Sequence, residues 1–310
     1  MIEKEITINA NGNNLTGTIC LPNEEGRFPI VLMIHGSGPL DRDENMPVQK
    51  LNVFNTIAHS LAKQGVASLR YDKRGCGKST GDYYSAGIFD VVDDAVSWFD
   101  FATTYEHFDA NKIFLLGHSE GCIIAPQVNI QRKTVAGHIL LCPFADNIES
   151  ILIKQAAQIE KEFEELTGFG GFIRKLLGRM MGANVQSQKK LLDKLKSSDK
   201  DTMRVMLQKI PAKSLRELIS LDPPTIFKQV TSPMLLIGGE KDLQCDPADV
   251  HTIAELVNVP VEKHVIKNLT HVLRFDEGKP SMLETTKLLN KPIEAIVLDT
   301  IENWLKTKVL

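Results

Sequence analysis

The chain contains six short apolar runs, and stretches with helical periodicity separate them. The runs are FPIVLMIH, VASLRY, KIFLLG, HILLCP, PMLLIGG and VEKHVI. Continuous apolar strands of this length are typical of a parallel sheet that is buried on both faces. Between the runs, apolar side chains recur at helical spacing in two series, Phe54, Ile57, Ala58 and Leu61, and Phe89, Val92, Val96 and Phe99. This alternation predicts an α/β fold, with a mostly parallel central sheet and helices on both faces.

Two segments depart from the alternation. In the first, EITINA and LTGTICL flank the turn-forming Asn11-Gly12, so we expect an N-terminal β-hairpin. In the second, residues 146–228 contain no convincing strand. Helical spacing there predicts one helix through Leu152, Ala156, Ile159, Phe163 and Leu166, and further helices over 172–181, 187–196 and 201–219. We therefore expect a helical cap at 146–228, inserted into an α/β core made of residues 1–145 and 229–310.

Charge and hydropathy argue against several classes of protein. The 36 basic and 39 acidic residues leave a net charge of −3, which disfavours a nucleic-acid or polyanion partner. No apolar run approaches the roughly 18 residues of a membrane-spanning helix, and MIEKEITINANG lacks the apolar centre of a signal peptide. The five scattered cysteines are Cys20, Cys76, Cys122, Cys142 and Cys245, never spaced C-x-x-C. We therefore expect a cytoplasmic protein with reduced thiols, no stable membrane insertion, no metal ion and no cofactor; homo-oligomerisation stays open.

The segment Gly117-His118-Ser119-Glu120-Gly121 joins the KIFLL strand to a predicted helix, GCIIAPQVNI. A serine in a tight strand-to-helix turn needs small residues two places before and after it, and Gly117 and Gly121 meet that need. Such a turn raises the hydroxyl above the sheet and turns backbone N–H groups toward any oxyanion that forms. We predict that Ser119 is a nucleophile; the alternative is a glycine-flanked helix cap.

A serine nucleophile needs a histidine base, which follows it in the chain order Ser, Asp, His. The other histidines fit poorly by position: His35, His59 and His107 precede Ser119, His118 lies inside the turn, His138 and His264 lie in strands, and His251 is on a predicted helix. His271 lies in NLTHVL, just after the VEKHVI strand, where a loop can direct an imidazole over the end of the sheet. We predict His271 as the base.

The acid that orients the base is expected on a loop at the end of a strand. Asp242 directly follows PMLLIGG, and its position relative to His271 is the best of the candidates. Asp246 and Asp146 also fit loosely, as alternatives with ordinary structural roles: a turn residue before Pro247 and a helix cap.

An oxyanion hole also needs N–H donors from a loop after an early strand. The IVLMIH strand ends in His35-Gly36-Ser37-Gly38-Pro39, where glycines allow backbone N–H groups to face a substrate. We predict the N–H groups of Ser37 and Glu120 as the pair. The alternative is a glycine turn that only reverses the chain.

Two other segments suggest different functions. Glycine patterns near Gly75 and Gly36 resemble nucleotide-binding loops, but Asp72, Thr80 and Asp41 occupy positions where glycine is required. The basic and apolar stretch FIRKLLGRMMG could touch a membrane surface. We expect instead that its apolar side chains close a pocket, while its Arg and Lys residues are solvated.

Taken together, HGSGP, YDKRGCGKS, GHSEG, GEKD and the late THV resemble the α/β-hydrolase superfamily. The chain is most similar to cap-bearing bacterial carboxylesterases near the dienelactone-hydrolase and acyl-peptidase branch, and the resemblance spans nearly all of it. One departure is Cys245-Asp246-Pro247 after GEKD, where the family commonly has a small β-branched residue and prolines.

The resemblance implies a serine hydrolase that cleaves small carboxylic esters through an acyl-enzyme, with Ser119, Asp242 and His271 as triad. A thioesterase or a hydrolase of small peptides or amides would use the same triad, and a catalytically inactive binding protein is the non-enzymatic alternative. An inserted cap near the strand ends predicts a roofed, apolar pocket for short acyl chains.

Overall fold

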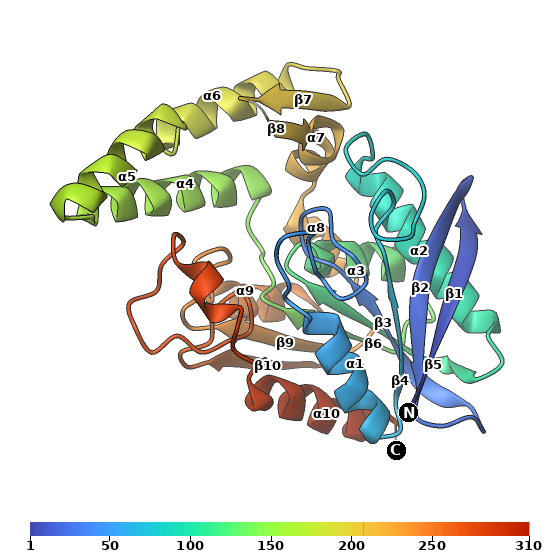
Figure 1. Cartoon of the computed structure of the whole chain (residues 1–310). Helices are drawn as coiled ribbons and strands as arrows, with labels where there is room; N and C mark the ends of the chain where they lie inside the picture. Colours follow the sequence, from blue (N-terminus) through green and yellow to red (C-terminus); the bar gives the residue numbers. More distant parts are fainter. Residues whose placement is uncertain (207, 310) are drawn as a thin grey trace.

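The structure is a computed structural model that describes residues 1–206 and 208–309. Its central sheet has eight strands in the order β1-β2-β4-β3-β5-β6-β9-β10 (Figure 1). The strands are β1 (Ile2–Ala10), β2 (Asn13–Leu21), β3 (Phe28–Ile34), β4 (Ala67–Tyr71), β5 (Phe108–His118), β6 (Gly137–Leu141), β9 (Met234–Gly239) and β10 (Val261–Ile266). Neighbours from β4 to β10 are parallel, whereas β2 pairs antiparallel with β1 and β4. The predicted mostly parallel sheet and N-terminal hairpin are confirmed.

Helices cover both faces of the sheet, because inner strands such as β3 and β9 carry apolar residues on both faces. Val31 and Met33 of β3 pack in one cluster with α1 and α10, whereas Ile30 and Leu32 pack in the other cluster with α2, α3, α8 and α9. These helices are α1 (Val53–Lys63), α2 (Ile88–Thr104), α3 (Gly121–Gln131), α8 (Pro223–Lys228), α9 (Asp249–Leu256) and α10 (Ala295–Val309). Phe89, the first residue of the apolar series in α2, is 46% exposed, whereas Val92, Val96 and Phe99 are buried.

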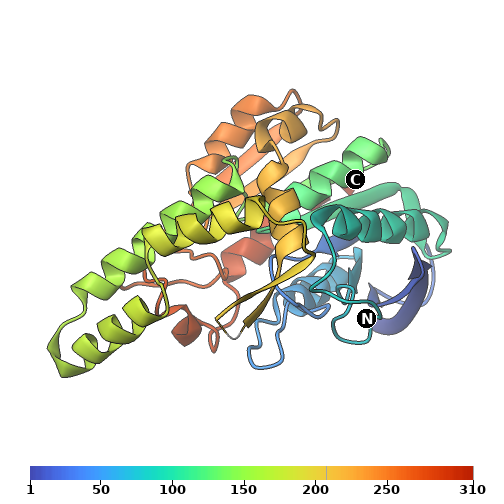
Figure 2. The ribbon, with the colours of Figure 1, turned by 90° about the horizontal axis from the view of Figure 1, so that it is seen from above.

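The segment 146–228 joins β6 to β9 in the chain. Its residues 148–220 lie above the end of the sheet where the parallel strands finish (Figure 1), whereas α8 packs on the face of the sheet. Its elements before α8 are α4 (Ile148–Glu165), α5 (Gly168–Met180), α6 (Val185–Lys196), β7 (Thr202–Val205), β8 (Gln208–Pro211) and α7 (Ala212–Ser220). Seen from above, α4, α5 and α6 form an arm that extends beyond the layers of the core (Figure 2). A short helix, η1 (Thr285–Leu288), interrupts the loop before α10.

The prediction of one helix over 201–219 is wrong. Its first half is an antiparallel hairpin of β7 and β8, and α7 begins only at Ala212; Leu207 lies outside the described residues. Met203 and Ile210 pair across the hairpin, and buried Met203 packs on Leu195 of α6. Pro211 directly precedes α7, where its missing N–H costs a helix nothing. Cross-strand pairing and proline therefore override the helical spacing.

All five cysteines are buried, and none forms a disulfide among the described residues. Among the described residues, no helix is both long and apolar enough to cross a membrane.

Candidate active site

Ser119 occupies a sharp turn between β5, which ends at His118, and α3, which begins at Gly121. Its φ of 53° lies in the left-handed region, which is rare and costly for a residue with a side chain. The Ser119 N–H donates to the carbonyl of Leu141 in β6 at 3.0 Å, and the Cys122 N–H donates to the Ser119 carbonyl at 2.9 Å. Backbone hydrogen bonds on both sides therefore hold the strained conformation.

Gly117 and Gly121 lie where the chain around Ser119 is most crowded. A Cβ on Gly117 would be 2.4 Å from the Gly121 carbonyl oxygen, and one on Gly121 would be 2.1 Å from the Ile34 carbonyl oxygen. Both distances are far below van der Waals contact, so neither position accepts a side chain without moving the backbone. β3, β5 and α3 thus meet at the turn because both residues are glycine.

The structure brings Ser119, His271 and Asp242 into one hydrogen-bonded series. The Ser119 Oγ lies 3.0 Å from Nε2 of His271, and Nδ1 of His271 lies 2.8 Å from Oδ2 of Asp242. Asp242 follows β9 and His271 follows β10, so both come from loops at the same edge of the sheet as Ser119. An ionised Asp242 accepts a hydrogen bond from the Nδ1–H of His271, which leaves Nε2 unprotonated and able to accept a hydrogen bond from the Ser119 hydroxyl.

Asp242 is buried yet held in its ionised form. Burial alone would raise the pKa of its carboxyl, but the charge and hydrogen bond of His271 lower it below its ordinary value. Backbone N–H groups of Gln244 and Cys245 also donate to Oδ1, at 2.8 and 3.0 Å. Oδ1 of Asp242 thus holds the loop through two backbone N–H groups, while Oδ2 orients His271.

The alternative acids have other partners. Asp146 accepts hydrogen bonds from Ser150 and Lys154 at the start of α4, at 2.9 and 3.0 Å. Asp246 accepts from the N–H of Ala248 at 3.0 Å, as a turn residue does. Neither is hydrogen-bonded to His271 in the part of the chain that the structure describes.

Among the other histidines, His138 is buried in β6, and its Nδ1 lies 3.0 Å from the Ser232 hydroxyl.

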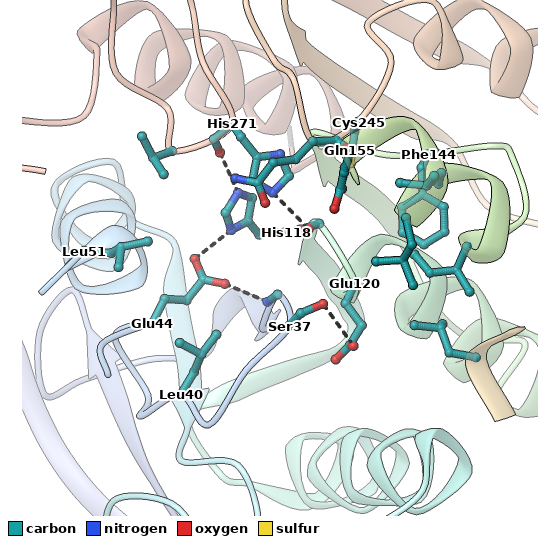
Figure 3. A pocket seen from close by; sticks show the side chains of 18 of the residues that line it. Ser37, Leu40, Glu44, Leu51, His118, Glu120, Phe144, Gln155, Cys245 and His271 are labelled. Atoms are coloured by element: carbon teal, nitrogen blue, oxygen red, sulfur yellow. Dashed lines mark hydrogen bonds and ion pairs between the residues drawn. The ribbon is translucent and has the colours of Figure 1, made fainter. Parts of the chain in front are cut away.

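The loop after β3 lies directly against Ser119. A Cβ on Gly36 would be 3.3 Å from Cβ of Ser119, so glycine permits this close approach. The Gly36 N–H is already engaged by Glu44 Oε1 at 2.8 Å. Over residues 1–206 and 208–309, the N–H groups of Ser37 and Glu120 donate no hydrogen bond within the protein. The side chains of Ser37 and Glu120 are joined at 3.1 Å (Figure 3).

Glu44 and His118 line the candidate site, and the sequence did not indicate that they interact. Oε2 of Glu44 lies 2.8 Å from Nδ1 of His118, and Nε2 of His118 donates to the backbone carbonyl of His271 at 3.0 Å (Figure 3). Burial would lower the pKa of His118, but Glu44 raises it; burial would raise the pKa of Glu44, but His118 lowers it. Both ring nitrogens of His118 face oxygen acceptors and Glu44 faces two N–H donors, so the geometry favours the charged forms of the pair.

Lys73 is a third residue that the sequence did not single out. Its Nζ donates to the Gly36 carbonyl at 2.6 Å and to Oε1 of Glu120 at 3.1 Å. Lys73 is 3% exposed, so the ammonium lies in a region where little water weakens its field. It joins the loop after β3 to the residue that follows Ser119.

A cavity of about 510 Å³ opens at Ser119 and His271. One apolar wall comes from residues next to β6 and from α4 and α7: Phe144, Ile148, Ile151, Leu152, Leu215 and Leu218. The opposite wall includes Leu40 and Leu51 (Figure 3). The prediction that FIRKLLGRMMG closes the pocket is wrong, because none of its side chains lines this cavity and most of its apolar ones are exposed.

A serine, a histidine and a carboxylate at the ends of parallel strands define the α/β-hydrolase class of serine hydrolases. The chain belongs to the family described as serine aminopeptidase, S33, whose model matches residues 48–278. It is 29% identical over 307 residues to the esterase EstD of Thermotoga maritima, covering 98% of this chain and 67% of that protein.

Solved structures show the same fold. The chain resembles Est1E of Butyrivibrio proteoclasticus, solved with bound ferulic acid, with a TM-score of 0.64 and 17% identity, over 98% of this chain and 99% of that one. It also resembles the Pyrococcus furiosus esterase Pf2001, with a TM-score of 0.60 and 16% identity, over 100% of this chain and 91% of that one. The predicted resemblance to α/β-hydrolases of the carboxylesterase kind is confirmed.

Proposed function

We propose that the chain is a carboxylesterase that cleaves short-chain esters through an acyl-enzyme, with Ser119 as nucleophile, His271 as base and Asp242 as orienting acid. The observation that carries the proposal is the unbroken series of hydrogen bonds from Asp242 to Ser119 at a cavity. The family and the esterase relative support hydrolysis of an ester bond by a serine hydrolase.

In the first step, His271 removes the Ser119 proton as Oγ attacks the ester carbonyl carbon. The imidazolium that forms is stabilised by Asp242 and then returns the proton to the alkoxide leaving group. Water attacks the acyl-enzyme in the second step, with His271 again as base, and releases the carboxylic acid. The developing oxyanion is stabilised by the N–H groups of Ser37 and Glu120, which have no other acceptor in the described chain.

The charges of the cavity favour an ester over a peptide with a free amino terminus. A substrate ammonium that leaves water is commonly paired with a carboxylate of the protein. Glu44 and Glu120 are the carboxylates that line the cavity within the described residues, and they pair with His118 and Lys73. The proposed substrate is therefore a neutral ester, although amides and thioesters can use the same triad.

We further propose that segment 146–228 acts as a cap. Side chains of α4 and α7 supply much of the apolar wall beside Ser119, which supports a roofed pocket for compact acyl and alcohol groups. Residues 1–145 and 229–310 then form the catalytic core.

A fluorophosphonate probe tests the assignment of Ser119. The wild-type chain should gain the mass of one phosphonyl group, and Ser119→Ala should gain none and lose at least roughly a thousandfold in kcat on p-nitrophenyl butyrate. Phosphonylation with no turnover of esters, thioesters or amides would favour the inactive binding protein. Turnover of amino-acid anilides faster than esters would favour the peptidase alternative.

A further inference from the structure

α5 carries an apolar face that is turned outward. Phe169, Phe172, Ile173, Leu176, Leu177 and Met180 are each between 42% and 81% exposed. At 100° per residue, these positions cover one continuous face of the helix. Met181, directly after the helix, extends the face and is 65% exposed. Single exposed apolar residues are common on protein surfaces, but a contiguous exposed apolar patch is typical of a binding site. We call these seven residues the α5 face.

The opposite side of α5 explains why the apolar residues point outward. Gly171 and Gly178 are buried there, and a Cβ on Gly178 would lie 2.9 Å from the ring of Phe163 in α4. A Cβ on Gly171 would lie 3.0 Å from the backbone of Leu166. α5 therefore packs through a glycine side, where larger side chains would not fit without a shift of their neighbours.

Basic residues flank the α5 face. Lys175 and Arg179 follow one edge, Arg174 follows the other, and α5 contains no acidic residue. Arg174 also lies beside Glu162 and Glu165 in a shallow groove, so Lys175 and Arg179 carry most of the unbalanced charge. An amphipathic helix of this kind places its apolar side chains among acyl chains, while long basic side chains reach the headgroups.

We propose that the α5 face docks the protein on the surface of an anionic phospholipid bilayer. A second copy of the chain fits less well, because two such faces in contact would bring their Lys and Arg borders together with no acid on either helix. The arm in Figure 2 holds α5 beyond the core, where a flat surface can reach it. The cavity contacts α4 only between Ile148 and Gln155, about 12 Å along the helix from Phe163, so docking leaves the active site uncovered.

Co-sedimentation of the full chain with lipid vesicles tests the proposal. The vesicles contain phosphatidylcholine alone or phosphatidylcholine with phosphatidylglycerol. We expect binding to the anionic vesicles that falls with added salt. The double substitution Leu176→Ser/Met180→Ser should weaken binding at least about tenfold, because two apolar side chains that leave water on binding are replaced by polar ones. Lys175→Gln/Arg179→Gln should weaken it by roughly fivefold per charge.

Controls separate the surface from a general effect on folding. Val265→Ser and Ile296→Ser change exposed apolar residues elsewhere and should bind vesicles as the wild type does. All variants should keep the wild-type kcat/KM on a soluble short ester, which is independent of this surface. Absence of binding to anionic vesicles, or equal binding by the α5 variants, would overturn the proposal. So would a concentration-dependent dimer that only the α5 substitutions dissociate, without vesicle binding, since the face would then contact a second copy.

Discussion

Glu44 and His118 form a buried ion pair, with Oε2 and Nδ1 2.8 Å apart, directly behind the proposed catalytic histidine. The ring of His118 lies 5.2 Å from that of His271, and Nε2 of His118 donates a hydrogen bond to the backbone carbonyl of His271. The second oxygen of Glu44 holds the Gly36 N–H. One pair therefore fixes both the loop that carries the base and the loop that carries an oxyanion donor.

Glu44→Gln should therefore reduce both stability and turnover. The amide has one acceptor oxygen and cannot accept from both the Gly36 N–H and a protonated His118, so the buried charge-assisted hydrogen bond is lost, which costs about 1–3 kcal/mol in the free energy of unfolding. Displacement of His271 and Gly36 should lower kcat about ten- to a hundredfold with little change in KM. Urea unfolding and steady-state kinetics on p-nitrophenyl butyrate measure the two effects.

Glu262→Gln is the matched control for that variant. Glu262 and His264 form a pair of the same chemistry at 2.9 Å, but both are largely exposed. Exposed pairs contribute only about 0–1 kcal/mol, so this variant should stay close to the wild type in both measurements. Equal losses from Glu44→Gln and Glu262→Gln would contradict the positioning role of the buried pair.

The stabilisation by the pair should depend on pH in a defined window. His118 has a pKa above its ordinary 6.5 in the folded chain, so its contribution is full below pH 6.5 and is lost as the pH rises through the folded pKa. Glu44 has a pKa below its ordinary 4.5, so its contribution is full above pH 4.5 and is lost at lower pH. The free energy of unfolding lost in His118→Gln should thus be largest between pH 4.5 and 6.5. A difference that grows above pH 6.5 would contradict the charge assignment.

The orienting role of Asp242 predicts a clear ranking of three substitutions. Asp242→Asn keeps the shape of the side chain but favours the wrong tautomer of His271, so kcat/KM should fall by about four orders of magnitude. Asp146→Asn and Asp246→Asn change residues with local partners and should keep most of the activity. The comparison requires kcat/KM for the three variants at one pH; the opposite ranking would move the orienting acid to another residue.

The core and the proposed triad were predictable because each depends on local signals. A continuous apolar run specifies a strand buried on both faces, and parallel strands bring their carboxyl ends to one edge. Ser119, Asp242 and His271 each directly follow such a run or the turn after it, so chain order alone placed them together. The glycines around Ser119 added a steric signal that does not depend on the rest of the fold.

The supporting charges were not predictable in the same way. Glu44 belongs to an irregular loop, and its partner His118 is 74 residues away in the chain. Lys73 reaches Glu120 across 47 residues. No spacing or periodicity indicates such pairs, because they depend on how the loops after β3 and β4 fold over the end of β5. The hairpin of β7 and β8 was missed for a related reason, since its stability comes from pairing and packing rather than helical spacing.

Helical periodicity in α5 correctly indicated one apolar face but not its direction. Burial of that face was the reasonable expectation, because most amphipathic helices cover a core. Gly171 and Gly178 let the opposite side of the helix pack closely against Leu166 and Phe163, which turns the apolar face outward. Small residues on the other side of the helix were therefore the overlooked signal.

The size of the cavity predicts a preference for short acyl chains. With α4 and α7 over Ser119, a volume of about 510 Å³ must hold both acyl and alcohol groups. p-Nitrophenyl acetate and butyrate should be turned over much faster than palmitate, and folded proteins should not be cleaved. Efficient turnover of palmitate would contradict a closed pocket.

A substitution in the wall tests which side holds the acyl chain. Leu215 of α7 lines the cavity, so Leu215→Ala should raise kcat/KM for hexanoate relative to butyrate by about tenfold, the usual value of one or two methylenes in an apolar pocket. Leu215→Trp should shift the preference toward acetate. Leu191 of α6 packs against the same small apolar cluster as Leu215 but does not line the cavity, so Leu191→Ala should leave the ratio unchanged. A second series of acetate esters varies the alcohol group instead. If Leu215→Ala changes kcat/KM across that series and not across the acyl series, this wall holds the leaving group. Leu40 and Leu51 on the opposite wall would then contact the acyl chain.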